Sequence, residues 1–449
     1  MRIHFIAIGG AIMHSLAIQL KRQGHIVTGS DDVIYEPARS NLLKNNLLPK
    51  QEGWDVSRIS DVIDLILVGM HAKLDNPELL MAQKLNLKLL SFPEYIFNYS
   101  INKKRIVIAG SHGKTTITSM ILHVLHDNNM EVDFLLGAKI DSLDNLVYLN
   151  DNKIIIIEGD EYFSSPLDNT SKFMHYKADI LVVSGVEWDH VNVFPTFELY
   201  KNNFSSLINN VIATSGTIFY CGDDVFLSKK LNNQRGSIRA YYLPNYRVND
   251  NQFIVESDDS DIPLHIFGKH NLYNLEAAKL VCQDLGVSIE KFNKSIQSFK
   301  GADKRLTLIK KNENNSAIYY DFAHSPSKVY ATINAIRELY PKRYLIACFQ
   351  LNTFSSLNPD FLPQYSNVFN NADEIWIYLD KESVKANEID YLNASYLKKV
   401  TNHKKLIFIN QKLDIKDKLE SFVMKDNNLL IMSSGNFSGI NIKRIFADH

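Results

Sequence analysis

The chain has 449 residues, of which 45% are apolar, 22% charged and 11% aromatic. This apolar share excludes a disordered protein, and at roughly 150 residues per domain the length indicates about three domains. With 49 basic and 50 acidic residues, the formal net charge is −1. That balance gives no general basic footprint, so we expect neither nucleic acid nor a membrane surface as a partner.

The three cysteines (Cys221, Cys282 and Cys348) lie far apart and form no C-x-x-C pair, which disfavours a disulfide framework and a zinc site. The N-terminus lacks the basic region and cleavage site of a signal peptide. The longest apolar runs are strand-sized and fall far short of the ~18 residues that span a bilayer. Together these features predict a soluble, cytoplasmic protein.

Short β-branched runs alternate with amphipathic helical patterns, which predicts an α/β fold with mainly parallel sheets. Three segments, 1–100, 101–300 and 301–449, each begin afresh with a strand, a loop and a helix, and we take them as three domains. The first should contain strands at 2–8, 26–29 and 65–68, a helix at 13–22 and a helix opened by Pro77.

The second segment should contain strands at 105–109, 154–157 and 180–183 and a helix at 115–125, with polar loops at 232–237 and 249–261. The third should contain strands at 318–321, 344–348 and 429–432, and a helix opened by Pro326 that runs to about 339.

The most informative stretch is Ala-Gly-Ser-His-Gly-Lys-Thr-Thr at 109–116, between a predicted strand and a predicted helix. Backbone N–H groups of such a glycine loop close around phosphate oxygens, and the helix N-terminus adds positive potential. Lys114 can reach the β- and γ-phosphates, and the Thr115 hydroxyl can bind Mg²⁺. The alternative is a glycine-rich turn with a solvated lysine.

Acidic residues follow the next two strands of this segment. Glu158 directly follows the strand at 154–157, where a metal-facing carboxylate belongs, whereas Asp160 and Glu161 are either further ligands or solvated loop acids. Asp189 and His190 follow the strand at 180–183. A lone histidine is more often structural, but its place in the same domain favours a metal role for His190.

Two further motifs come later in the chain. Asn271 and Asn274 stand in Gly-Lys-His-Asn-Leu-Tyr-Asn, where each side-chain amide could meet an adenine edge or, more plainly, cap a helix. Arg305 and the stretch Asp-Phe-Ala-His-Ser-Pro at 321–326 could face a nucleotide from a second domain, with the arginine neutralising a transferring phosphoryl group.

The N-terminal pattern Ala7-Ile-Gly9-Gly10, with Asp31 about twenty residues on, is similar to a dinucleotide fingerprint. Ala7 replaces its first glycine, and the phosphate loop downstream would be unexplained in a nicotinamide-dependent dehydrogenase. These two departures favour another nucleotide-linked diphosphate at this site.

Taken in order, these motifs resemble the Mur ligase superfamily along essentially the whole chain. The resemblance implies a three-domain architecture: a Rossmann-like N-terminal domain that binds a UDP-sugar, a central P-loop ATPase domain, and a Rossmann-like C-terminal domain for the amino substrate and for closing over ATP. Asn352, in Phe-Gln-Leu-Asn-Thr at 349–353, stands where members of the superfamily usually have a cation, and Ser325 replaces a second histidine.

The resemblance also implies residue roles. ATP would be bound by the phosphate loop, by the asparagines and by the C-terminal domain (Gly110, Ser111, His112, Gly113, Lys114, Thr115, Thr116, Asn271, Asn274, Arg305 and Asp321). The UDP-sugar would be held by Gly9, Gly10, Met13 and Asp31, and Mg²⁺ by Thr115, Glu158 and His190. The catalytic set would be Lys114, His190, Arg305 and His324.

The implied reaction joins the lactyl carboxylate of UDP-N-acetylmuramate to the amine of the tripeptide L-Ala-γ-D-Glu-meso-diaminopimelate in peptidoglycan recycling, with ATP and Mg²⁺. The segment after Glu161 and the stretch Met-Ser-Ser-Gly-Asn-Phe-Ser-Gly at 432–439 favour the tripeptide. L-alanine as the amino substrate, and a non-catalytic UDP-sugar-binding relative, are the alternatives. The base that takes the amine proton is left open between His190, His324 and water.

Overall fold

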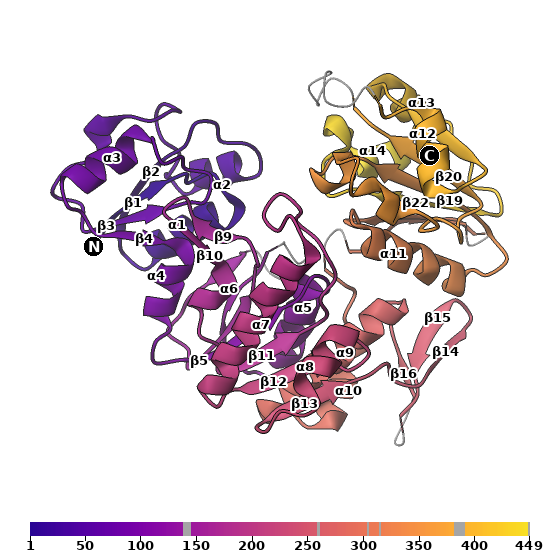
Figure 1. Cartoon of the computed structure of the whole chain (residues 1–449), viewed down its shortest axis with the longest axis horizontal. Helices are drawn as coiled ribbons and strands as arrows, with labels where there is room; N and C mark the ends of the chain where they lie inside the picture. The colour runs from indigo at the N-terminus through magenta and orange to yellow at the C-terminus, as the bar shows by residue number, and fades with distance from the viewer. Residues whose placement is uncertain (138–144, 258–260, 303–304, 314–315, 381–390, 448–449) are drawn as a thin grey trace. The chain divides into compact units, whose positions relative to one another are not determined.

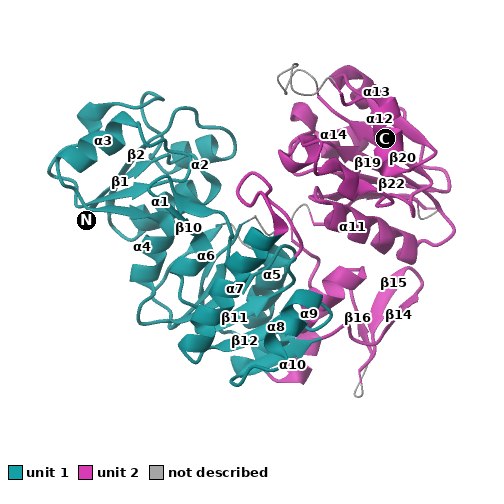
Figure 2. Cartoon of the chain, viewed as in Figure 1, with its two compact units in different colours: residues 1–186, 198–241, 277–287 teal, residues 187–197, 242–276, 288–449 magenta. Residues whose placement is uncertain are grey.

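The computed structural model describes residues 1–449 except 138–144, 258–260, 303–304, 314–315, 381–390 and 448–449. Helices and strands alternate along the chain, which confirms the α/β prediction (Figure 1). The described residues form two compact units: residues 1–186, 198–241 and 277–287, and residues 187–197, 242–276 and 288–449 (Figure 2). No helix among the described residues is long and apolar enough to cross a membrane.

The first sheet of unit 1 has four parallel strands in the order β2-β1-β3-β4. The strand β3 is buried at all four positions, as expected for a parallel strand covered on both faces. The helix predicted at 13–22 begins two residues earlier, directly after Gly10. The elements are β1 (Arg2–Ile6), α1 (Ala11–Arg22), β2 (Ile26–Ser30), α2 (Ala38–Lys44), η1 (Val56–Arg58), β3 (Leu65–Val68), α3 (Pro77–Lys84), β4 (Leu89–Ser91) and α4 (Phe92–Tyr99).

The second sheet of unit 1 has seven strands in the order β13-β12-β11-β5-β8-β6-β7, parallel except for β7. Its central strands β5, β8 and β11 carry the three sequence motifs at their carboxyl ends. The elements are β5 (Lys104–Ala109), α5 (Lys114–Asp127), β6 (Asp133–Leu135), β7 (Val147–Tyr148), β8 (Ile154–Glu158), β9 (Phe163–Ser165), β10 (Asp168–Ser171), α6 (Lys172–His175), β11 (Ile180–Val183), α7 (Phe197–Ala213), β12 (Thr217–Cys221), α8 (Val225–Leu231) and β13 (Ile238–Tyr241).

Unit 2 contains a small antiparallel sheet and a larger one. The smaller sheet corrects one prediction: the stretch 249–261, expected as a loop, contains the strand β15, because Phe253 and Val255 alternate into the interior. Its elements, with the helices that follow, are β14 (Tyr246–Asn249), β15 (Gln252–Val255), β16 (Ile262–Pro263), α9 (Lys269–Asp284) and α10 (Ile289–Ile296). The helix α9 begins in unit 2 and ends in unit 1.

The larger sheet of unit 2 has the order β17-β18-β22-β19-β20-β21, with only β17 antiparallel. Side chains of Ile318, Tyr320, Leu429 and Ile431 form a core on one face, together with residues of the last helix. The elements are β17 (Thr307–Lys311), β18 (Ala317–Asp321), α11 (Pro326–Leu339), β19 (Tyr344–Gln350), η2 (Ser355–Leu357), η3 (Leu362–Tyr365), β20 (Glu374–Tyr378), α12 (Ala394–Thr401), β21 (Leu406–Ile409), α13 (Lys412–Glu420), β22 (Asn427–Met432), η5 (Phe437–Gly439) and α14 (Ile442–Ala447).

Candidate active site

The phosphate loop joins β5 to α5 and depends on two glycines. Gly110 has φ +129° and Gly113 has φ +77°, both in the region that side chains disfavour. A Cβ on Gly110 would lie 2.2 Å from the Ser184 hydroxyl at the end of β11, so no other residue fits there. The loop therefore has the open backbone that a phosphate cradle requires.

Lys114, the first residue of α5, is not a solvated lysine. Its ammonium donates to the Gly110 carbonyl at 2.7 Å and lies 2.7 Å from the Glu161 carboxylate. Burial alone would lower the pKa of Lys114, but the carboxylates of Glu161, Asp160 and Glu158 raise it above its usual value. The side chain therefore stays cationic and directed back over the loop.

Glu161 was weighed as a solvated loop acid, and that interpretation is wrong because its side chain is fully buried. The Tyr200 hydroxyl donates to Glu161 at 3.1 Å and also lies 2.9 Å from the Ser111 hydroxyl. Asp160 is partly exposed and pairs with Lys172 at 2.6 Å. Tyr200 and Lys172 were missed, since no sequence signal links either residue to the loop.

Thr115 and Glu158 form an oxygen pair beside the phosphate loop. The Thr115 hydroxyl donates to Glu158 Oε1 at 2.8 Å, and the Gly137 N–H donates to Glu158 Oε2 at 2.7 Å. Hydroxyl and carboxylate oxygens are the ligands that Mg²⁺ prefers, so these two residues fit that ion. No group of three or more His, Cys, Asp or Glu arranged to hold a metal occurs among the described residues.

His190, the third predicted metal ligand, belongs to unit 2, whereas Thr115 and Glu158 belong to unit 1. Its backbone N–H donates to the carboxylate of Asp189 at 2.8 Å. Asp189 is almost fully buried and pairs with Lys328 at 3.0 Å, and it lies 3.7 Å from Nε2 of His324. The segment that carries His190 is thus held by an ionic contact with α11.

His324 lies in this cluster as a neutral side chain. Burial lowers the pKa of His324 to about 3, and the Lys328 ammonium acts in the same direction, while Asp189 opposes both. Nδ1 of the ring is 3.0 Å from the Phe322 carbonyl, which makes Nδ1 the protonated nitrogen. His324 is therefore an uncharged imidazole at neutral pH and a weak base.

Arg305 and Asp321 lie in the same unit, next to the start of the large sheet. The Arg305 guanidinium stacks over the Phe322 ring at 4.5 Å. Asp321 ends β18 and accepts from the Thr332 hydroxyl at 2.5 Å and from the Leu306 N–H at 3.3 Å. Arg305 is thus held by the loop that follows β18, and Asp321 by α11 and the Leu306 backbone.

Asn271 and Asn274 are buried within the first turns of α9, so the capping interpretation does not hold. The Asn271 amide donates to the Phe267 carbonyl at 2.9 Å, and the Asn274 amide donates to Asn271 at 3.3 Å. These bonds fix the orientation of both amides. Their adenine role stays a prediction.

At the N-terminal loop, the Gly9 N–H donates to the Asp31 carboxylate at 2.7 Å, which brings the two predicted ligands together. Burial raises the pKa of Asp31 to about 6, although the Gly9 bond favours the charged form. Ala7 has φ +68°, the conformation that the missing glycine would supply, at a cost of about 1 kcal/mol. Met13 is buried in α1.

Known proteins resemble this chain in sequence and in fold. Residues 108–282 match the Mur ligase middle domain. The chain is 30% identical to a UDP-N-acetylmuramate–L-alanine ligase of Caldicellulosiruptor bescii over 83% of this chain and 82% of that protein. It is 28% identical to a UDP-N-acetylmuramate–L-alanyl-γ-D-glutamyl-meso-2,6-diaminoheptandioate ligase of Haemophilus influenzae, over 75% and 76%.

A solved UDP-N-acetylmuramate–alanine ligase from Thermotoga maritima has the same fold, with a TM-score of 0.75 at 18% identity, covering 100% of this chain and 98% of that one. The phosphate loop, the Thr115–Glu158 pair and these likenesses lead to one conclusion. The chain belongs to the Mur ligase family, whose members are ATP-dependent ligases that form amide bonds.

Proposed function

We propose that this ligase joins the lactyl carboxylate of UDP-N-acetylmuramate to the amine of L-Ala-γ-D-Glu-meso-diaminopimelate. The observation that carries the ATP-dependent step is the arrangement of Lys114, held between the Gly110 carbonyl and buried Glu161. A lysine fixed at the start of α5 is placed to neutralise charge on a transferring phosphoryl group. No side chain is needed as a nucleophile.

The reaction has two steps. The lactyl carboxylate oxygen attacks the γ-phosphorus of ATP and ADP leaves, which gives an acyl phosphate. The amine nitrogen then attacks the acyl carbon, phosphate leaves, and the amine loses a proton to a base. His324, with a pKa of about 3, is too weak a base for that last role, which leaves His190 and water as candidates, and Arg305 would act on the phosphoryl charge. When bound, Mg²⁺ would be held by Thr115 and Glu158 with His190, and it would neutralise phosphate charge.

Two observations support the tripeptide as amino substrate. The segment after Glu161 forms the hairpin of β9 and β10, which leads into α6 before β11 begins. The Haemophilus influenzae relative is named for that tripeptide. The second candidate is L-alanine, favoured by the Caldicellulosiruptor bescii relative, which is named for alanine and matches a larger share of the chain.

A matched pair of assays separates the two candidates. The purified protein is mixed with ATP, Mg²⁺ and UDP-N-acetylmuramate, and ADP release is followed with either tripeptide or L-alanine. We expect turnover with tripeptide and little with L-alanine. Turnover that depends on alanine and not on tripeptide would move the assignment to the alanine-adding activity. Tight UDP-sugar binding without any turnover would indicate a non-catalytic relative.

A further inference from the structure

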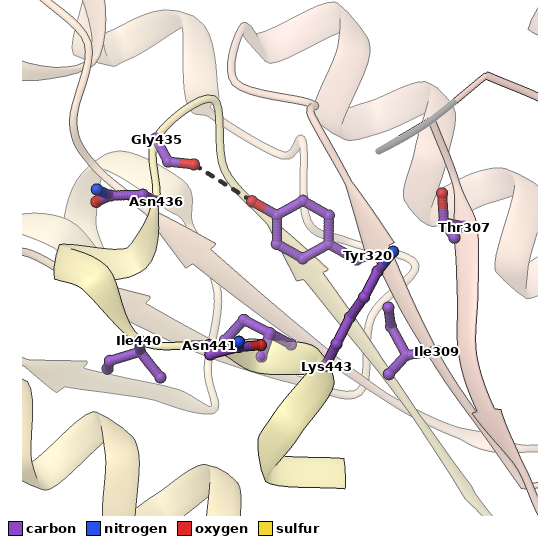
Figure 3. Close-up of a pocket in the computed structure, with 9 residues that line it drawn as sticks. Thr307, Ile309, Tyr320, Gly435, Asn436, Ile440, Asn441 and Lys443 are labelled. Carbon is purple, nitrogen blue, oxygen red and sulfur yellow. Dashed lines mark hydrogen bonds between the residues drawn. The ribbon is translucent and has the colours of Figure 1, made fainter. Parts of the chain in front are cut away.

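Two features of the described residues are left unexplained by the proposed reaction. One is a pocket of about 320 Å³ in unit 2, where the Lys443 side chain extends from α14 beside Tyr320 and Ile309 (Figure 3). Apolar, amide and lysine side chains line it together, and this mixture selects no single class of ligand. The other is a cluster of polar side chains buried in unit 1, between β1, β2 and α3. Its contacts lead to Asp31, one of the residues predicted to hold the UDP-sugar.

The buried polar cluster consists of His4, Ser30 and Glu78, whose side chains are fully buried. His4 of β1 pairs in register with Thr28 of β2, and strand residues two positions apart share a face, so Ser30 lies on the same face as His4. Nδ1 of His4 lies 2.8 Å from the Thr28 hydroxyl, and Nε2 lies 3.3 Å from the Glu78 carboxylate. Glu78 stands in the first turn of α3, so this helix meets the sheet through polar contacts.

Each carboxylate oxygen of Glu78 contacts a different segment of the chain. Oε2 accepts from the hydroxyl of Ser30, the last residue of β2. Oε1 accepts from the Asp55 N–H at 2.8 Å and lies 3.6 Å from the Arg58 guanidinium. Glu78 therefore joins the end of β2 to the segment 53–58.

The same two segments hold the backbone of Asp31. On one side Asp31 directly follows Ser30, whose hydroxyl is bound to Glu78. On the other side the Asp31 carbonyl accepts from the Gly53 N–H at 2.7 Å. The Arg58 guanidinium, next to Glu78, donates to the Gly53 carbonyl at 2.8 Å. Both supports of Asp31 thus depend on one buried carboxylate.

The position of the Asp31 side chain matters for the glycine loop as well. The Gly9 N–H donates to Asp31 Oδ2 at 2.7 Å, and a Cβ on Gly9 would lie 2.9 Å from the same oxygen. An apolar contact would join α3 to the sheet at lower cost, because removing a carboxylate from water opposes folding. The buried acid is therefore explained better by the place in which it holds Asp31 than by stability.

We propose that Glu78, together with Ser30 and His4, is a positioning residue for UDP-sugar binding that acts through Asp31. Because Glu78 is fully buried, it acts without touching the substrate. A carboxylate that is already in place loses less conformational freedom when the nucleotide sugar binds, and this raises the affinity. The inference rests on the UDP-sugar part of the proposed function and holds for either amino substrate.

The test measures the affinity of full-length variants for UDP-N-acetylmuramate by calorimetry, with melting temperatures to establish that each variant is folded. Ser30→Ala removes the hydroxyl that reaches Glu78, and Glu78→Gln keeps the size of the side chain but loses one of its two acceptor oxygens. The control Ser100→Ala removes an equally buried serine hydroxyl of unit 1, which donates to the Ile96 carbonyl at 2.7 Å. Ser30→Ala is also made in an Asp31→Ala background.

We expect Ser30→Ala and Glu78→Gln each to raise the Kd for UDP-N-acetylmuramate about fivefold, because side chains that support a binding residue change affinity by about two- to thirtyfold. The KM for this substrate should rise by the same factor, while kcat and the KM for ATP stay unchanged, since Lys114 and its loop are formed by other residues. Ser100→Ala should change none of these values. In the Asp31→Ala background, Ser30→Ala should add less than about twofold, since no carboxylate is left to position.

The outcomes separate this inference from the proposed function. If the wild type binds UDP-N-acetylmuramate and both cluster variants bind it equally well, the positioning role is overturned and the function stands. A fivefold loss that persists in the Asp31→Ala background, or an equal loss in Ser100→Ala, overturns the role too, because the cluster would then act on the fold in general. If the wild type does not bind UDP-N-acetylmuramate, the proposed function fails, and the positioning role fails with it.

Discussion

The contact between Asp189 and Lys328 gives the sharpest test of how the His190 segment is held. The Lys328 ammonium lies 3.0 Å from a carboxylate whose side chain is 3% exposed, while the lysine itself is 20% exposed. Lys328→Met would remove the ammonium from the Asp189 carboxylate, which keeps the His190 N–H and lies next to His324, a neutral side chain. Removing one partner of a buried pair costs about 3–5 kcal/mol, and the partial exposure of Lys328 points to the lower end.

If the free energy needed to open the segment 187–197 falls by about 3 kcal/mol, its amides exchange more than a hundredfold faster, since 1.4 kcal/mol is a factor of ten. Hydrogen exchange read by mass spectrometry on peptides covering 187–197 measures this, because the amides of His190, Val193 and Phe194 are hydrogen-bonded there. The control Lys416→Met removes an exposed pair worth at most about 1 kcal/mol. Equal exchange in the two variants would refute the reasoning.

Three further predictions follow from other contacts. Lys114→Met should lower kcat for ADP release by at least about a hundredfold and leave UDP-N-acetylmuramate binding by calorimetry nearly unchanged, and parallel loss of both would contradict separate sites. Burial alone would raise the pKa of Glu78, but bonds from His4, the Asp55 N–H and Ser30 lower it. The stability that Glu78 contributes is therefore present above its unfolded pKa of about 4.3 and is lost as pH falls through the lower folded value. In Glu78→Gln the melting temperature should therefore decrease less between about pH 4.5 and pH 3 than in the wild type. An equal decrease in both would show that Glu78 does not contribute to the acid dependence of stability. Because the folded pKa of Asp31 is raised to about 6, its contribution is present below its unfolded pKa and is lost as pH rises through 6. Asp31→Asn should therefore raise the melting temperature more at pH 8 than at pH 4, and a pH-independent difference would show that Asp31 does not titrate near 6.

Periodicity and glycine placement predicted most of the elements. The helix expected from Pro326 to about Leu339 has those bounds, and β3 and β11 lie where four-residue apolar runs indicated. The pattern failed at β15, where a short buried strand lies within a polar stretch. The capping interpretation also placed the start of α9 too late: the helix begins at Lys269, and the Asn271 amide donates to the carbonyl of Phe267, which lies just before the helix. In both cases the prediction followed the polar composition of the stretch, whereas burial in the folded chain decided the structure.

The candidate site was predicted as a set of motifs but not as a set of contacts. Thr115 and Glu158, 43 residues apart, were expected to share Mg²⁺ from the family resemblance, and they lie 2.8 Å apart because β5 and β8 pair in parallel. No comparable rule connects Lys114 with Glu161 or Glu161 with Tyr200, since a buried acid in a loop has the same sequence signature as a solvated one. Burial is a property of the packed chain, and the sequence does not display it.

The amino-acid sequence alone determined the order of strands and helices, the phosphate loop and the family to which the motifs belong, because these depend on residues within one short stretch. The tertiary structure decided which distant side chains meet: Asp189 with Lys328, and Thr307 with Lys443 in one pocket. Such meetings depend on strand order and helix packing, which bring together residues more than a hundred positions apart. The pairing of charges and the shape of a binding pocket arise at that level.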